Sequence, residues 1–250
     1  MNVGYWLTAG LAMTLIAFSK AGFGGGPGVL AAPLMSTVCD PTTAIAVMLP
    51  IMMVCDVWCV TVYRRGCVWS LVWRLLGGFI IGVGVATFLL VEVSGQEVWL
   101  KKVIGALSIL FGLSYFLFLK DKKRMERTIP QGSWFGLAMG VFAGISSTLA
   151  HAAGPPVAMY LMSQAKGQSK DNFMGTIIMF AFFGNLIKVP SYLLSGAMTR
   201  ETLAITWPLL AAIPFGLWLG WLLNRRLSYT NFQVWINLLL VIIGVFLVLT

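Results

Sequence analysis

The stretch Lys20-Ala-Gly-Phe-Gly-Gly-Gly-Pro-Gly28 interrupts a strongly apolar part of the chain. Four glycines and a proline occupy residues 24–28, and such a run does not continue a helix. A second break, Ser146-Ser-Thr-Leu-Ala-His-Ala-Ala-Gly-Pro-Pro156, comes near the start of the second half. In both breaks proline stands where a new short helix is expected to begin, a position that needs no N–H donor. The fold is therefore expected to be built around two broken helices.

The sequence outside the breaks is too apolar for a soluble protein. Hydrophobic residues make up 59% and charged residues 10% of the 250-residue chain, whereas soluble domains carry about 25% charged residues. Runs at 27–39 and 154–165 fall short of the ~20 residues that cross a bilayer, and are expected to be half-helices or re-entrant limbs. We predict an all-α integral membrane protein with about eight full spans, at 3–19, 41–63, 69–91, 98–119, 132–150, 172–195, 201–224 and 230–250.

The net charge of +9 is explained mostly by topology. Twelve of the seventeen Lys and Arg residues fall on alternate connections between the runs, at 64–74, 120–127, 166–171 and 225–226. The opposite connections hold only Lys101, Lys102 and Arg200. Basic residues concentrate in cytoplasmic loops, so we expect the first set in the cytoplasm and both termini outside. The expected surroundings are therefore a lipid bilayer, and no nucleic-acid partner is predicted.

The two halves of the sequence resemble each other at an offset of roughly 127 to 134 residues. Pro33-Leu-Met-Ser36 matches Tyr160-Leu-Met-Ser163, and Asp56 falls opposite Asn185. We therefore divide the chain into a first membrane repeat (1–119), a cytoplasmic linker (120–131) and a second membrane repeat (132–250). The first repeat begins outside and the second inside, so the repeats are inverted. Inverted repeats with broken helices are typical of secondary transporters.

The breaks are expected to bind a small anion. A helix N-terminus carries unpaired N–H groups and a partial positive charge, and glycine lets a ligand approach the backbone closely. The alternative is that the glycines only allow helices to cross at short distance. The predicted substrate-binding residues are Lys20, Gly24, Gly25, Gly26, Gly28, Ser147, Thr148, His151, Gly154 and Asn185.

Several of these side chains have a second interpretation. His151 either contacts the anion and couples to protons or, as a neutral imidazole, bonds a freed carbonyl. Lys20 either binds the anion or extends to the membrane edge, and Ser147 and Thr148 either donate to the anion or bond back to their own helix. Asp56, a coupling or structural group, pairs with Lys20, takes a proton, or bonds the hairpin tip. Lys188 follows Asn185 by one turn, and either attracts anions or lies near the outer surface.

Gly22-x-Gly24-Gly25-Gly26 followed by Pro33-Leu34, with a degenerate second copy around Gly154-Pro155, resembles the TauE/SafE family of membrane transporters. The resemblance covers nearly the whole chain. It implies export of sulfite or of organosulfonates such as sulfoacetate across a bacterial-type inner membrane. The second copy departs from the glycine-rich pattern at His151-Ala152-Ala153, a difference that bears on which anion is accepted.

The leading hypothesis is a secondary exporter that works by alternating access. Outward movement of each negative charge gains about 2.3 kcal/mol per 100 mV when the cytoplasm is negative, and both uniport and proton coupling stay open. A passive anion channel is the alternative. Ser147 and His151, four residues apart, have the spacing of a nucleophile and a base, but no third member is evident and we predict no enzyme. No cofactor and no metal are predicted, and the sequence does not define an oligomeric state.

Overall fold

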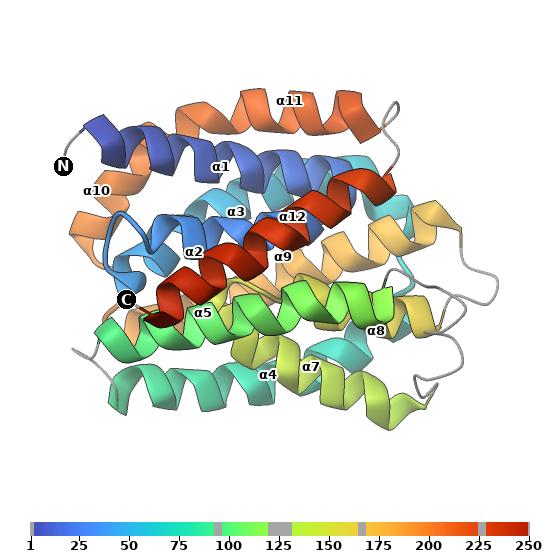
Figure 1. Ribbon diagram of the computed structural model, residues 1–250. Helices are drawn as coiled ribbons and strands as arrows, with labels where there is room; N and C mark the ends of the chain where they lie inside the picture. Colours follow the sequence, from blue (N-terminus) through green and yellow to red (C-terminus); the bar gives the residue numbers. More distant parts are fainter. Residues whose placement is uncertain (1–2, 93–96, 120–131, 165–168, 225–228, 250) are drawn as a thin grey trace.

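The fold consists of helices throughout the described part of the chain. The computed structural model describes residues 3–92, 97–119, 132–164, 169–224 and 229–249 (Figure 1). The predicted linker at 120–131 and the basic residues at 120–127, 166 and 225–226 lie outside the described residues. In chain order the elements are α1 (Val3–Phe23), η1 (Gly26–Leu30), α2 (Ala31–Met35), α3 (Pro41–Tyr63), η2 (Arg64–Gly66), α4 (Trp69–Glu92), α5 (Glu97–Ser114), η3 (Tyr115–Leu119), α7 (Ser133–Ala150), α8 (Gly154–Ser163), α9 (Lys170–Leu194), α10 (Arg200–Leu209), η4 (Leu210–Ala212), α11 (Ile213–Asn224) and α12 (Tyr229–Leu249).

These helices are those of an integral membrane protein. Within the described residues, six stretches are long and apolar enough to cross a membrane: Pro41–Gly66, Trp69–Glu92, Glu97–Leu117, Ser133–Ala150, Asp171–Leu194 and Arg200–Leu222. The all-α class is thereby confirmed for the described chain. Helices α1 and α12 occupy the other two predicted spans, and the total of eight crossings stays a prediction. The two short runs form η1 with α2, and the ten-residue α8.

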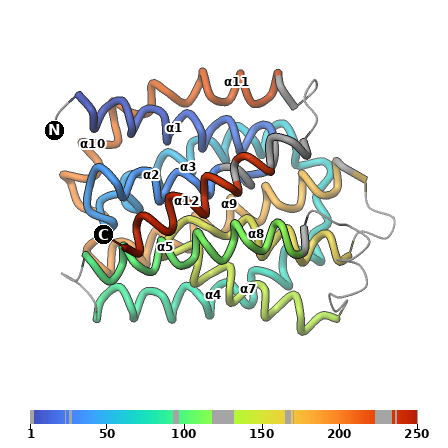
Figure 2. The backbone as a smooth tube through the Cα atoms, in the orientation of Figure 1, coloured from blue at the N-terminus to red at the C-terminus, as the bar shows by residue number. Residues whose placement is uncertain are grey.

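The helices pack in pairs that combine the two halves of the sequence. Helix α1 packs on α11, α7 on α4, and α5 on α12, while α3 and α9 pack on each other. In Figure 1 the α1–α11 pair lies at the top of the bundle and the α4–α7 pair at the bottom. The tube in Figure 2 brings the start of α1 and the end of α12 to the same end of the bundle. Helices from both halves of the sequence therefore line the interior of the bundle.

In two of these helix pairs, α4–α7 and α1–α11, the two helices approach each other closely at glycine. A β-carbon added to Gly82 of α4 would lie 2.1 Å from the Val141 carbonyl oxygen of α7, and one added to Gly220 of α11 would lie 2.3 Å from the Phe18 carbonyl oxygen of α1. Real side chains do not fit at such distances. Small residues of this kind let membrane helices pack backbone to backbone, which gives the bundle its rigid outer pairs.

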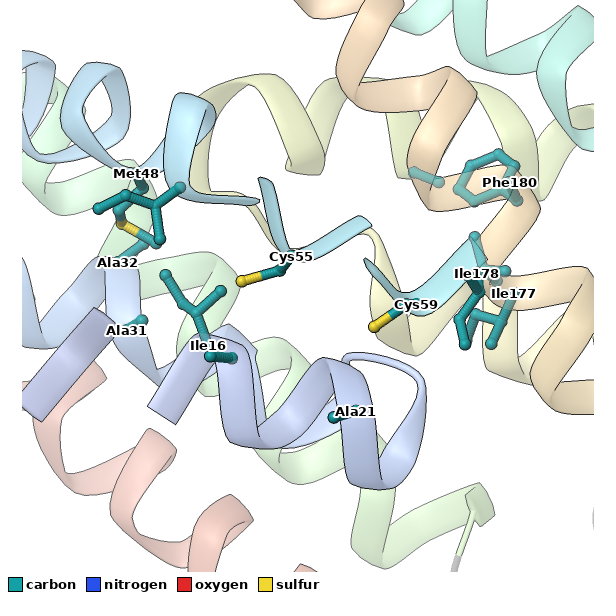
Figure 3. Close-up of a cluster of buried hydrophobic side chains, with 14 of the residues drawn as sticks. Ile16, Ala21, Ala31, Ala32, Met48, Cys55, Cys59, Ile177, Ile178 and Phe180 are labelled. Carbon is teal, nitrogen blue, oxygen red and sulfur yellow. The ribbon is translucent and has the colours of Figure 1, made fainter. Parts of the chain in front are cut away.

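The interior of the bundle is mostly apolar. Figure 3 shows Cys55 and Cys59 of α3 among side chains such as Ile16 of α1 and Ile177 of α9. On the outside, large apolar residues such as Trp207 are also exposed, as expected for helices that face lipid. A charged group buried inside such a bundle is costly and marks a functional position by default.

Candidate functional site

The first break is a tight reversal stabilised by its own backbone. Helix α1 ends at Phe23, and Gly24 and Gly25 take positive φ values of 69° and 103°, which favour glycine. The Gly25 N–H donates to the Ser19 carbonyl at 3.1 Å, and the Gly28 N–H donates to Ser19 Oγ at 2.7 Å. The reversal therefore returns η1 to the last turns of α1 and leaves Lys20 inside the bundle.

The second break reverses the chain at a non-glycine residue. His151 has a φ of 51°, the only positive φ at a non-glycine among the described residues. Its N–H donates to the Ser147 carbonyl at 2.9 Å, and the Ala152 N–H donates to the Ser146 carbonyl at 3.2 Å. Histidine is strained in this conformation, and strain of this kind persists where the surroundings hold it. Here those surroundings are hydrogen bonds between the imidazole ring and two other helices, α3 and α9.

Lys20 and Asp56 form a buried ion pair between α1 and α3. Lys20 is 5% exposed and Asp56 is 1% exposed, and the ammonium donates to Asp56 Oδ1. The second oxygen, Oδ2, accepts from Asn185 Nδ2 of α9 at 2.5 Å. Of the three interpretations of Asp56, the structure contains the pairing with Lys20. Asp56 and Asn185, which the sequence comparison of the two halves aligns, contact each other directly, so both oxygens of the carboxylate are occupied.

Lys188 lies one turn beyond Asn185 and is fully buried, with an exposed fraction of 0%. Its ammonium lies 2.9 Å from His151 Nδ1 and donates to the Ser147 carbonyl at 3.4 Å. The other ring nitrogen, His151 Nε2, lies 2.7 Å from the Ile45 carbonyl of α3. A carbonyl only accepts, so Nε2 carries the hydrogen and Nδ1 presents its lone pair to Lys188. His151 is therefore neutral and bonds a carbonyl of another helix.

The His151 hydrogen bond meets α3 where that helix is weakened. Pro50 lies inside α3 and offers no N–H to the Ala46 carbonyl, next to Ile45. Tyr192, one turn beyond Lys188, donates its hydroxyl to the Thr148 carbonyl at 2.7 Å, and its ring packs edge-on against the imidazole. These contacts fix the orientation of the imidazole against Lys188.

The remaining predicted residues contribute unequally. Thr148 Oγ1 donates to the Gly144 carbonyl at 2.9 Å, which is the bond back to its own helix. Ser147 Oγ has no hydrogen-bond partner among the described residues, although the residue is buried. Gly24 and Gly25 form the first reversal, followed by Gly26 and Gly28 at the start of η1, whereas Gly154 starts α8. Because Pro155 and Pro156 follow Gly154, the first turn of α8 has few N–H groups to offer a ligand.

One turn of α9 brings the two breaks together. Asn185 reaches the first break through Asp56 and Lys20, and Lys188 reaches the second through His151. Lys188 and Tyr192 were not among the predicted site residues. Their spacing could have identified them, since residues 188 and 192 lie on the same face of the helix as Asn185.

The thiols do not form part of this polar group. Cys55 and Cys59 lie in the apolar cluster of Figure 3. Within the described residues, no group of three or more His, Cys, Asp or Glu side chains is arranged to hold a metal ion. The polar group consists of the Lys20–Asp56 ion pair, the Asn185 amide, His151 and Lys188.

The model of the family described as Sulfite exporter TauE/SafE matches residues 9–247, nearly the whole chain. The chain belongs to the TauE/SafE family. Membership in TauE/SafE indicates a multi-pass membrane transporter of sulfite or related anions rather than an enzyme. No curated protein and no solved structure gives a match.

Proposed function

We propose that this TauE/SafE chain is a secondary transporter that exports a small sulfonate or sulfite-like anion, sulfoacetate among the candidates, across a bacterial-type inner membrane. The observation that carries the proposal is the balance of buried charge where the two breaks meet. Two lysines, Lys20 and Lys188, lie there with one carboxylate, Asp56. An uncompensated positive charge inside a membrane protein calls for an anion, because isolated buried charges are costly.

We further propose that the anion lies near the membrane midplane, between the starts of η1 and α8. Each start carries the partial positive charge of a helix N-terminus, and this charge adds to that of the lysines. Gly28 already donates to Ser19, and Pro155 and Pro156 have no N–H. We therefore assign the larger share of the binding free energy to side chains, and the smaller share to backbone donors.

The pairing of helices supports an alternating-access mechanism with inverted repeats. Helix α1 meets α11 as α7 meets α4, while α3 and α9 meet each other at the centre. A two-fold relation between residues 1–119 and 132–250 produces this exchange of partners. The rigid pairs α1–α11 and α4–α7 then rock about α3 and α9, and expose the anion first to one side and then to the other.

The experiment that tests the proposal is thermal stabilisation of the purified protein by anions. Sulfite, sulfate, sulfoacetate, isethionate and acetate are added at equal ionic strength, with sodium chloride and a neutral solute as controls. We expect a rise in Tm with at least one sulfonate or with sulfite, because a ligand that binds only the folded state stabilises it. Stabilisation by a cation or neutral solute alone would contradict the proposal.

The position of the anion is tested with two variants. His151→Ala removes the acceptor that orients Lys188, and Gly25→Leu places a side chain at the first reversal, where the added β-carbon meets no atom within 4 Å but the φ of 103° is strained. Both are expected to weaken anion-induced stabilisation. An unchanged Tm shift in both variants would place the anion elsewhere.

A further inference from the structure

The buried charges near the two breaks are not equivalent. Both oxygens of Asp56 are occupied, one by Lys20 and the other by Asn185. Lys20 and Asp56 therefore neutralise each other and form an internal ion pair. The single ion pair found among the described residues is this one, so Lys188 has no carboxylate partner there.

The ammonium of Lys188 is only partly satisfied. It has three N–H donors, and its neighbours are the neutral His151 Nδ1 at 2.9 Å and the Ser147 carbonyl at 3.4 Å. One of these contacts is long, and neither partner carries a negative charge. A buried ammonium in this state gains strongly from an anionic oxygen placed against its remaining hydrogen.

A second donor without a partner lies on the same residue that Lys188 already contacts. Ser147 is 5% exposed, and its hydroxyl makes no hydrogen bond within the part of the chain that the structure describes. Helix α7 thus carries a hydroxyl on the residue whose carbonyl accepts from Lys188, and an oxyanion has several oxygens with which to accept from both groups.

We propose that Lys188, with the Ser147 hydroxyl, is the binding group for the transported oxyanion, and that the site is matched to a sulfonate or related group of single negative charge. His151 acts as a positioning residue that holds the Lys188 ammonium in place. This inference rests on the proposed function. It assigns Lys20 to the internal pair with Asp56 rather than to the substrate.

The charge balance explains the preference for a monoanion. With the Lys188 amine protonated, Lys20, Asp56 and Lys188 together carry one net positive charge, and His151 is neutral. A bound monoanion brings the buried sum to zero. A bound dianion leaves one negative charge without a cation. If Lys20 pairs with the dianion instead, the Asp56 carboxylate loses its cation.

The test compares isethionate, a monoanionic sulfonate, with sulfoacetate, a dianionic sulfonate of similar size. Dissociation constants are measured at pH 7.5 and constant ionic strength for the wild-type protein, Lys188→Met, Lys188→Arg, Ser147→Ala and Lys102→Met. Lys102 is exposed, so its variant removes a lysine at the surface of α5. The melting temperature of each ligand-free variant reports whether it folds.

We expect the wild-type protein to bind isethionate at least ten-fold more tightly than sulfoacetate. Lys188→Met should weaken isethionate binding about 100-fold, as truncation of a buried charge pair does, without lowering the ligand-free Tm. Lys188→Arg should keep most of the affinity, Ser147→Ala should lose about ten-fold, and Lys102→Met should stay within three-fold.

The outcomes separate this inference from the proposed function. If the wild-type protein binds neither sulfonates nor sulfite, the proposed function fails and the inference fails with it. If the wild-type protein binds them and Lys188→Met binds within three-fold of it, only the assignment to Lys188 is overturned. If sulfoacetate binds more tightly than isethionate to the wild-type protein, the charge balance is refuted without any variant.

Discussion

The ion pair between Lys20 and Asp56 gives a sharp prediction about stability. Replacing Asp56 with leucine removes the acceptor of the Lys20 ammonium and also that of the Asn185 amide. Breaking a buried pair from one side costs about 3–5 kcal/mol, and an unsatisfied buried amide costs about 1–3 kcal/mol. We therefore expect Asp56→Leu to lower the free energy of unfolding by about 4–8 kcal/mol.

The partner substitutions complete a double-mutant cycle. Lys20→Met leaves the carboxylate with Asn185 alone and should cost about 3–5 kcal/mol. The double variant Lys20→Met/Asp56→Leu removes both charges and leaves only the Asn185 amide unsatisfied, at about 1–3 kcal/mol. The double variant should therefore be more stable than either single variant, which is opposite to additive behaviour.

The assay is reversible unfolding of the purified protein in mixed micelles, followed by tryptophan fluorescence without any added anion. Lys102→Met, which removes an exposed charge, serves as the control and should change the unfolding free energy by less than about 0.5 kcal/mol. Two single variants that each lose less than about 1 kcal/mol, with additive losses in the double variant, would refute the buried pair.

Three further predictions concern the helix contacts, the first reversal and a partly buried thiol between α2 and α3. Gly82→Val puts a β-carbon 2.1 Å from the Val141 carbonyl oxygen, so it should abolish folding or lower Tm by more than 10 °C. Gly84→Val is the control and should be tolerated, because no atom lies within 4 Å of the added carbon. Gly24→Ala is expected to be destabilising, because its φ is 69° and the new carbon would lie 2.6 Å from Ile177; stability equal to wild type would contradict the reversal. Burial raises the pKa of Cys39 to about 12, and the neighbouring Asp40 adds to this effect. The rate of maleimide labelling of Cys39 should therefore rise about ten-fold per pH unit from pH 7 to 10. A plateau in this rate near pH 9 would count against this environment.

Much of the fold was predictable because a continuous local run of apolar residues is enough to predict each membrane helix. Each predicted run contains a helix, and the breaks fall at the glycines and prolines that interrupt those runs. The sequence also predicts that Asp56 and Asn185 occupy matching positions of a repeat, since such positions are compared by offset alone. Their direct hydrogen bond could not be predicted in this way, because it depends on the packing of α3 against α9.

The site was harder to predict because its contacts join distant segments. His151 bonds Ile45 across 106 residues, and no local pattern specifies that partner. Lys188 had two interpretations in the sequence; packing buries its side chain completely, which argues against a position at the outer surface, and attraction of an anion by Lys188 stays a prediction. The glycine breaks indicated backbone donors for an anion, yet Gly28 donates to Ser19 Oγ within the break itself. The buried side-chain charges, unlike the glycine breaks, became evident only from the packing of the helices.

Counterflow in proteoliposomes tests whether the protein carries a small sulfonate-like anion by alternating access. Vesicles loaded with unlabelled isethionate are placed in a trace of labelled isethionate, and accumulation of label is compared with that in vesicles without internal substrate. We predict saturable accumulation that requires internal substrate and is lost in Lys188→Met. Label that enters equally in both kinds of vesicle, without saturation, would contradict a carrier and indicate a passive anion channel.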